Sequence, residues 1–296
     1  MLEASPFWIS VSILISLSSH FARGWRWALM LSPLGYRISP FKAFLAVMVG
    51  YLVNIPTARL GEVARCALLK KSSDVPFEAS FGAIVAERLM DLSMLFIISA
   101  FTFFLEYDKV GVFIVDKLGW AAEGLLGKMN FLVILGIIFL IFITFLWIFR
   151  QKIINNSLFM KLKKVVLNFK DGFLGIRQLS RSQLSLFLFL TFSIWVLYFF
   201  MSYTLFFSKP ETTHLGMKCA LTLLVMSGLG VTIPTPGGFG SYHLFVIFTL
   251  TVYGLAEESS KSFAFLMHSS QLFSLSFFGL ISLIISMLYN KNKTKG

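Results

Sequence analysis

The sequence predicts an all-α protein of the membrane, a polytopic bundle of helices in a single transmembrane domain over residues 1–296. Three observations predict this class. Hydrophobic residues fill 57% of the 296 positions and charged residues only 14%, whereas soluble domains carry about 25% charged residues. Phe alone occurs 34 times. Several apolar runs also reach the roughly 18 residues that mark a membrane-spanning helix.

Five segments are predicted as full spans because they are long and apolar. They are residues 7–31, 77–105, 131–149, 184–207 and 262–288. The third and fourth contain no Asp, Glu, Lys or Arg, and the last has His268 as its single ionisable side chain. The first begins almost at the N-terminus, where Met1-Leu2-Glu3 lacks the basic region of a signal peptide.

The net charge of +12 is unevenly distributed, and this predicts the topology. Residues 150–183 contain eight Lys or Arg against one acid, Asp171. Basic residues also follow the first span and fill the C-terminal tail, whereas the linkers near Glu106 and Glu257 are acidic. Basic flanks stay in the cytoplasm, so we expect the segment 150–183 and the C-terminus there. Because the charge flanks spans, we expect no nucleic-acid partner.

The basic segment 150–183 also has apolar residues at helical spacing, opposite its lysines. This pattern is typical of an amphipathic helix that lies on anionic lipid. A helix that packs against the base of the bundle is an equal alternative.

Two further segments, 41–76 and 219–255, are apolar but broken. In the first, the apolar stretch before Pro56 has 15 residues, which is short for a span. The topology requires this segment to begin and end in the cytoplasm, so we predict a re-entrant hairpin. The second segment is interrupted by residues 234–240 and begins and ends outside. Two full spans and a second hairpin remain alternatives for it.

The two breaks resemble each other in sequence. Val53-Asn54-Ile55-Pro56-Thr57 and Val231-Thr232-Ile233-Pro234-Thr235 match at four of five positions. Paired, Pro/Gly-interrupted short segments of opposite orientation are typical of inverted repeats with a binding site near the membrane midplane. Chance similarity of a five-residue string is the alternative.

Charged residues inside the predicted span 77–105 indicate a functional site. Glu87 and Asp91 share one helix face, and Arg88 can reach an adjacent helix. An ionised group at this depth costs about 2.5 kcal/mol or more and generally faces a bundle interior or a cavity. The alternative is that these residues lie hydrated at the cytoplasmic end.

Other polar residues lie close to the breaks and to the end of the first span. Glu62 and Arg65 are three residues apart and are expected to pair. His20, Arg23 and Arg26 form a stripe, for which arginines that reach lipid phosphates are the simple explanation.

Glycines in the second break are expected to expose backbone N–H groups that bind an anion, with a packed helix kink as the alternative. The predicted substrate-binding set combines both breaks with the intramembrane charges. It comprises Asn54, Arg59, Glu62, Arg65, Glu87, Arg88, Asp91, Pro236, Gly237, Gly238, Gly240 and His243. We predict no catalytic residue, no cofactor and no metal, since the four histidines lack a ligand spacing. Cys66 and Cys219 are expected to be small buried hydrophobes.

These motifs resemble the transmembrane region of the bacterial lysylphosphatidylglycerol synthase family, whose members are flippase-like membrane proteins. The resemblance rests on five strings in matching order. They are Arg26-Trp27, Gly50-Tyr51-Leu52-Val53-Asn54, Arg59-Leu60-Gly61-Glu62-Val63-Ala64-Arg65, Glu87-Arg88-Leu89-Met90-Asp91 and Pro234-Thr235-Pro236-Gly237-Gly238-Phe239-Gly240. This chain departs from the family at His243, where many members have Glu. Members also usually have a further spanning helix before the one that starts this chain, so we expect it to begin at the second.

The resemblance implies a flippase-like translocator of lipid, or of a lipid-linked head group, in the bacterial inner membrane. Its partner would be an anionic phospholipid or lipid-linked molecule. Aminoacylation belongs to a soluble C-terminal domain in longer members, and this chain ends at Gly296, so we do not expect an enzyme. No ATP-binding motif occurs, so transport would be passive or ion-coupled. The alternatives are a membrane-embedded transferase, with the buried carboxylates as bases, and a non-catalytic partner of an envelope enzyme.

Overall fold

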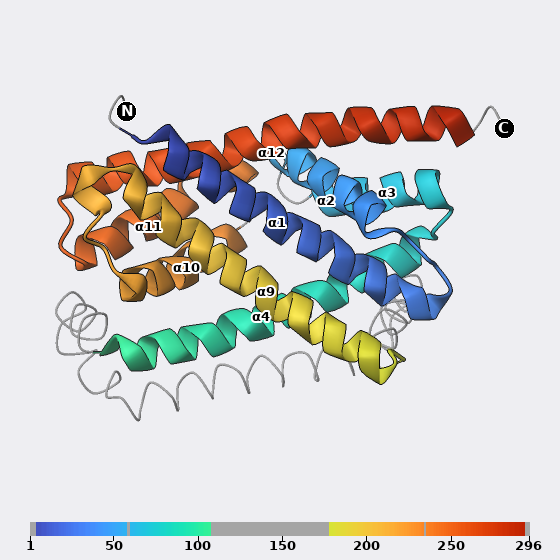
Figure 1. Cartoon of the computed structure of the whole chain (residues 1–296), viewed down its shortest axis with the longest axis horizontal. Coiled ribbons are helices and arrows are strands. Elements are labelled where there is room, and N and C mark those ends of the chain that lie inside the picture. Colours follow the sequence, from blue (N-terminus) through green and yellow to red (C-terminus); the bar gives the residue numbers. More distant parts are fainter. Residues whose placement is uncertain (1–3, 58–59, 108–177, 234, 294–296) are drawn as a thin grey trace, which may run out of the picture.

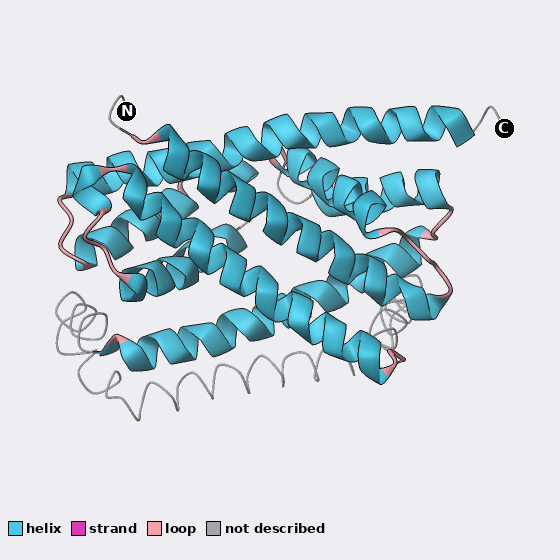
Figure 2. Ribbon diagram, viewed as in Figure 1, coloured by secondary structure: helices cyan, strands magenta, loops and turns pink. Residues whose placement is uncertain are grey.

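The structure is a computed structural model that describes residues 4–57, 60–107, 178–233 and 235–293. The predicted span 131–149 lies outside the described residues, as does most of the basic segment 150–183. In the described part all regular structure is helical (Figure 2). In chain order the helices are α1 (Pro6–Leu31), η1 (Ser32–Leu34), α2 (Pro40–Asn54), α3 (Gly61–Ser73), α4 (Phe77–Leu105), α9 (Arg181–Leu205), η4 (Phe206–Ser208), η5 (Pro210–Thr212), α10 (Met217–Thr232), η6 (Pro236–Gly238), α11 (Ser241–Val252) and α12 (Glu257–Lys293).

Helices α4, α9 and α12 are long and apolar enough to cross a membrane, over Phe77–Leu105, Arg181–Ser208 and Glu257–Tyr289. Helix α1, also predicted as a span, has 26 residues. At about 1.5 Å per residue it is long enough for a hydrocarbon core of about 30 Å. It is less apolar than the other three because its buried face carries serines, His20 and two arginines.

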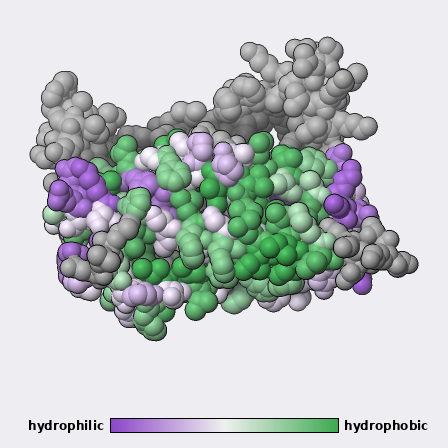
Figure 3. Space-filling view, turned by 90° about the horizontal axis from the view of Figure 1, so that it is seen from above, coloured by the Kyte–Doolittle hydropathy of each residue, from purple (hydrophilic) through white to green (hydrophobic). Residues whose placement is uncertain are grey.

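The surface has the hydropathy of a membrane protein. Figure 3 shows a broad apolar middle between hydrophilic ends. Large apolar side chains such as Phe189, Phe192 and Leu244 are more than half exposed, as expected where lipid replaces water. The chain is therefore a helical membrane bundle, as predicted from its composition.

Long helices cross the whole length of the molecule and pack closely through small residues. Helix α1 lies against α9 and α2, and α2 lies against α12 (Figure 1). A Cβ added to Gly24 would stand 2.6 Å from the backbone nitrogen of Phe44, and one on Gly279 would stand 2.8 Å from Leu52 Cβ. Glycine at these two positions lets the helix backbones approach each other, as is typical of membrane helices.

The broken segments form two helical hairpins at opposite ends of the molecule (Figure 1). The α2–α3 hairpin opens toward the end that carries the C-terminus, and the α10–α11 hairpin opens toward the other end. Helices α10 and α11 have 16 and 12 residues, or about 24 and 18 Å. Because these lengths are too short for two full spans, the structure favours a hairpin for residues 219–255.

The turns of the two hairpins meet inside the molecule. A Cβ added to Gly237 would stand 3.2 Å from the carbonyl oxygen of Ile55, so the two breaks in the chain are in contact. Within each hairpin the limbs are also tightly packed, at Gly50 against Gly61 and at Gly230 against Tyr242. Each break is thus packed on one side against protein, although Pro56 and Phe239 beside the contact are exposed.

Within the described residues, the helices before and after residues 108–177 follow the same order of lengths. Helices α1, α2, α3 and α4 have 26, 15, 13 and 29 residues. Helices α9, α10, α11 and α12 have 25, 16, 12 and 37 residues. Both halves are therefore long, short, short and long, and the similar strings lie at the end of the first short helix of each. Since the hairpins also open toward opposite ends, this order of the described helices is the one expected of an inverted repeat.

We expect Gly61→Ala to lower the stability of the fold, because a Cβ at this position would collide with the carbonyl oxygen of Gly50. Overpacking of this kind costs about 1–3 kcal/mol. Thermal unfolding of the purified protein in detergent measures the effect. Gly216→Ala is the matched control, since a Cβ there meets no atom within 4 Å. Equal melting temperatures for the two variants would contradict the close packing of α2 and α3.

Candidate functional site

Two carboxylates of α4 lie in the interior against two arginines of α1. Glu87 and Asp91 are one helical turn apart, as are Arg23 and Arg26, so each pair projects from one face of its helix. Arg23 Nη1 lies 2.6 Å from Glu87 Oε1 and 2.7 Å from Asp91 Oδ2. Arg26 Nη2 lies 2.7 Å from Asp91 Oδ1 and 3.5 Å from Glu87 Oε1. Both arginines and Glu87 are buried, so these ion pairs belong to the bundle interior.

Helix α3 adds a third buried arginine. Arg65 Nη2 donates to Glu87 Oε2 at 2.9 Å, and its guanidinium carbon lies 4.1 Å from the ring centroid of Trp27, a favourable cation–π contact. Beside it, Arg88 Nη2 donates to Glu62 Oε1 at 2.8 Å, and the Arg88 side chain is 46% exposed. We define the arginine–carboxylate cluster as Arg23, Arg26, Glu62, Arg65, Glu87, Arg88 and Asp91.

Helix α9 supplies neutral acceptors to the same arginines. Arg23 Nη2 donates to the hydroxyl of Tyr198 at 3.0 Å, and Arg26 Nη1 lies 3.3 Å from Thr191 Oγ1. Helices α1, α3, α4 and α9 therefore meet at the cluster. Because α9 belongs to the second half of the repeat, the cluster links the two halves of the chain.

Positive charge exceeds negative charge in the buried part of the cluster. Arg23, Arg26 and Arg65 are fully or almost fully buried, and they face Glu87 and Asp91, which leaves one positive charge uncompensated. The Nε atoms of all three arginines are buried and have no hydrogen-bond partner among the described residues. A buried, uncompensated ion costs several kcal/mol. A bound anion would supply both the missing charge and the missing acceptors.

The first break is closed by a side chain. Asn54 Oδ1 accepts a hydrogen bond of 2.7 Å from the N–H of Gly61, the first residue of α3. Asn54 therefore holds the two limbs of the α2–α3 hairpin together. This places Glu62 and Arg65, on the first turns of α3, beside α4.

The second break is held by a histidine of α12. Gly237, Gly238 and Gly240 have φ values of 59°, 78° and 84°, which glycine adopts at little cost. His268 Nε2 lies 2.8 Å from the carbonyl oxygen of Gly237. Because a carbonyl only accepts, His268 Nε2 must donate this bond. The ring of His243 lies 4.5 Å from that of His268, centroid to centroid.

The backbone donors predicted at the second break are partly used within the turn. The N–H of Gly238 donates to the carbonyl of Thr235 at 3.1 Å, and the N–H of Phe239 donates to that of Pro236 at 3.2 Å. The prediction that this break offers its N–H groups to an anion is therefore wrong for these two groups. A tight turn satisfies part of its own backbone in this way.

Two other expectations about the charged residues are also wrong. Glu62 and Arg65 do not pair with each other, because Arg88 and Glu87 on α4 approach them more closely. Arg23 and Arg26 do not extend to lipid phosphates, since both are buried against α4. The alternative of hydrated carboxylates fails for Glu87, whose side chain is 0% exposed.

The remaining predictions concern Arg88, the two cysteines, Arg59 and metal binding. The reach of Arg88 to an adjacent helix is confirmed by its bond to α3, and Cys66 and Cys219 are buried. Arg59 lies outside the described residues. Within the described ranges, no group of three or more His, Cys, Asp or Glu side chains is placed to hold a metal ion.

Comparison with known proteins identifies the family. The family model described as the lysylphosphatidylglycerol synthase TM region matches residues 1–279. The chain belongs to this family. The match includes both hairpins and every residue of the arginine–carboxylate cluster.

Two proteins that are similar to this chain come from Methanocaldococcus jannaschii. The UPF0104 membrane protein MJ1078 is 26% identical over 243 residues, which cover 79% of this chain and 94% of the relative. The UPF0104 membrane protein MJ1595 is 23% identical over 118 residues, covering 39% of this chain and 33% of the relative. No solved structure matches the chain.

Several residues of the site were absent from the substrate-binding set that the sequence predicted. Arg23 and Arg26 are central to the cluster, although the sequence pattern was explained by contact with lipid. His268 was noted only as the ionisable residue of an apolar run, and that isolation is the signal that could have identified it. Tyr198 and Thr191 carried no sequence signal, because a single hydroxyl in an apolar span is common.

We expect Glu87→Gln to destabilise the protein strongly, because it removes the charge that Arg23, Arg26 and Arg65 share. Removal of one partner from a buried ion pair costs about 3–5 kcal/mol. The melting temperature in detergent reports the loss. Glu257→Gln is the control, since Glu257 forms an exposed pair with Lys261 and its loss should leave the melting temperature unchanged. A Glu87 variant as stable as this control would contradict the role assigned to the cluster.

Proposed function

We propose that this protein binds the anionic phosphate head group of a membrane lipid, or of a lipid-linked molecule, and translocates it between the two leaflets. The family description associates such chains with membrane lipids. The observation that carries the proposal is the excess of buried arginine over carboxylate beside the two hairpins. A bound phosphate would neutralise that excess.

Arginine suits this ligand for a physical reason. Its planar guanidinium presents several N–H donors in a fixed fork, which matches the oxygens of a phosphate. Arg88 on α4 is partly exposed, whereas Arg65 on the adjacent helix α3 is buried. We therefore assign first contact with the phosphate to Arg88 and deeper binding to Arg65, with Arg59 as a further candidate.

The carboxylates favour binding over catalysis. Each oxygen of Glu87 and Asp91 lies within 2.9 Å of an arginine nitrogen. A general base must instead reach a proton of the substrate. Carboxylates held by arginines act to position those arginines, which argues against the alternative of a membrane-embedded transferase.

The inverted repeat supports movement of a lipid head group between the two sides of the membrane. Two hairpins that enter from opposite ends and touch at their turns can rock against each other, so that a site between them opens to either side in turn. His268 on the side of the second hairpin, and Asn54 on the first hairpin, lie next to the residues of this contact. We place the basic end, with the C-terminus, in the cytoplasm of the cell.

Reconstitution into lipid vesicles tests the proposal. We expect the protein to accelerate the flipping of a fluorescent phosphatidylglycerol, measured by the fraction of label that dithionite bleaches with time. Arg88→Gln should slow this rate about ten-fold or more, because it removes a cation from the mouth of the cluster. Because the Arg88 side chain is about half exposed, we expect the variant to fold, and its melting temperature checks this.

Lys261→Gln is the matched control, since it removes one positive charge at an exposed position remote from the cluster. It should flip lipid as fast as the unmodified protein. A flip rate in vesicles with the unmodified protein equal to that in protein-free vesicles would overturn the proposal. Equal flip rates for Arg88→Gln and Lys261→Gln would show that Arg88 is not part of the binding site.

A further inference from the structure

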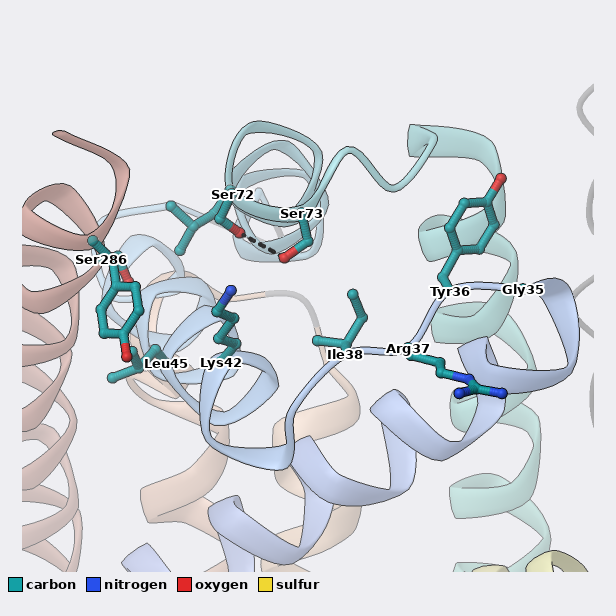
Figure 4. Close-up of a pocket in the computed structure, with 11 residues that line it drawn as sticks. Gly35, Tyr36, Arg37, Ile38, Lys42, Leu45, Ser72, Ser73 and Ser286 are labelled. Atoms are coloured by element: carbon teal, nitrogen blue, oxygen red, sulfur yellow. Dashed lines mark hydrogen bonds between the residues drawn. The ribbon is translucent and has the colours of Figure 1, made fainter. Parts of the chain in front are cut away.

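A cavity of about 600 Å³ opens at the basic end of the molecule, apart from the arginine–carboxylate cluster. It lies between the start of α2, the end of α3 and the end of α12 (Figure 4). This volume is in the usual range of small-ligand sites, about 300–1,000 Å³. The polar residues that line it include Arg37, Lys42, Ser72, Ser73 and Ser286.

The lining of this cavity is positively charged. Arg37 and Lys42 are its two ionised residues, and no Asp or Glu lines it. Neither cation forms an ion pair with a described residue. In Figure 4 the Lys42 side chain extends into the space between α2 and α3, toward Ser72 and Ser73, which lie within 3.5 Å of each other. Lys42 and the hydroxyls of Ser72 and Ser73 form a set of donors for one anion, whereas the Arg37 guanidinium points away from them and adds positive charge to the cavity lining.

The deeper wall of the cavity is apolar. Leu45 and Leu68 line it, and the Tyr289 ring stands 5.6 Å from Lys42 Nζ. A free phosphate ion would leave this apolar surface uncovered. A phospholipid would place its phosphate among the cations and hydroxyls, and its glycerol esters against the leucines. The chemistry therefore favours a lipid phosphate over a soluble one.

The cavity and the cluster lie along one face of α3. Arg65 and Ser72 are seven residues apart, so they share that face and are separated by about 10 Å of helix rise. Leu69 lies between them and is buried. The cavity is thus a separate site, close to the cluster and closed from it by apolar side chains.

We propose that this cavity binds the phosphate of an anionic phospholipid at the basic membrane surface, through Lys42 and the hydroxyls of Ser72 and Ser73, with Arg37 adding positive charge to the lining. Binding here presents the lipid to the cluster, and this loading step rests on the proposed function. The binding site itself does not depend on transport.

Photo-crosslinking tests the site directly. The full chain in neutral detergent is labelled with a phosphatidylglycerol that carries a diazirine on its head group, and the labelled peptides are mapped by mass spectrometry. We expect adducts on the peptides that contain Ser72–Ser73 and Tyr289. In the double variant Arg37→Gln/Lys42→Gln these adducts should fall at least five-fold.

The matched control is Lys70→Gln/Lys71→Gln. It removes two positive charges from the same end of the molecule, at exposed positions that do not line the cavity. Labelling should be unchanged in this variant. Equal losses in both double variants, or no loss in Arg37→Gln/Lys42→Gln, would overturn the proposal. Melting temperatures confirm that both variants fold.

Competition separates the possible sources of the phosphate. Excess unlabelled phosphatidylglycerol should abolish the adducts, whereas inorganic phosphate at millimolar concentration should not. Complete competition by inorganic phosphate would overturn the lipid assignment. In the flip assay, Arg37→Gln/Lys42→Gln should raise the lipid concentration needed for half-maximal rate without lowering the maximal rate. Labelling that persists in a protein without flip activity would refute the proposed function and leave the cavity site standing.

Discussion

The ion pairs between α1, α3 and α4 constrain much of the described structure. Charged side chains gain little from water in the interior of a membrane bundle, so each must find a partner of opposite charge or an oriented dipole. Glu87 satisfies this requirement by accepting from Arg23 and Arg65 at once. The position of α3 relative to α1 and α4 therefore follows from where Glu87 can be neutralised.

The need to hydrogen-bond backbone N–H and C=O groups imposes a second constraint. Helices α2 and α10 end at the two breaks, and unpaired N–H and C=O groups at membrane depth are costly. Asn54 satisfies the N–H of the first residue of α3, and His268 satisfies the carbonyl of Gly237 in the second break. Gly237 also lies close to the carbonyl oxygen of Ile55. The two hairpins thus form one packed contact that a rocking motion could rearrange as a unit.

Charge patterning also distinguishes two kinds of cation in this protein. Arg23, Arg26 and Arg65 are ordered by carboxylates inside the bundle. Arg37 and Lys42 line an open cavity at the basic end. Arginines whose side chains are already ordered lose little conformational entropy when they bind a ligand. The outer pair, Arg37 and Lys42, is placed to bind a ligand at the membrane surface. Arg65 of the cluster and Ser72 of the cavity lie about two turns apart on α3.

Much of the fold was predictable from the sequence alone. Apolar length predicted α4, α9 and α12, and Pro and Gly predicted both breaks, because these signals are local. The sequence also indicated Glu87 and Asp91, since charge within an apolar run is unusual. Only the tertiary structure decided the partners: Arg65 pairs with Glu87 and not with Glu62, and Arg23 lies inside the bundle and not at its surface. The reason is that helix spacing shows which residues share a face, whereas a partner on another helix is set by how the helices pack.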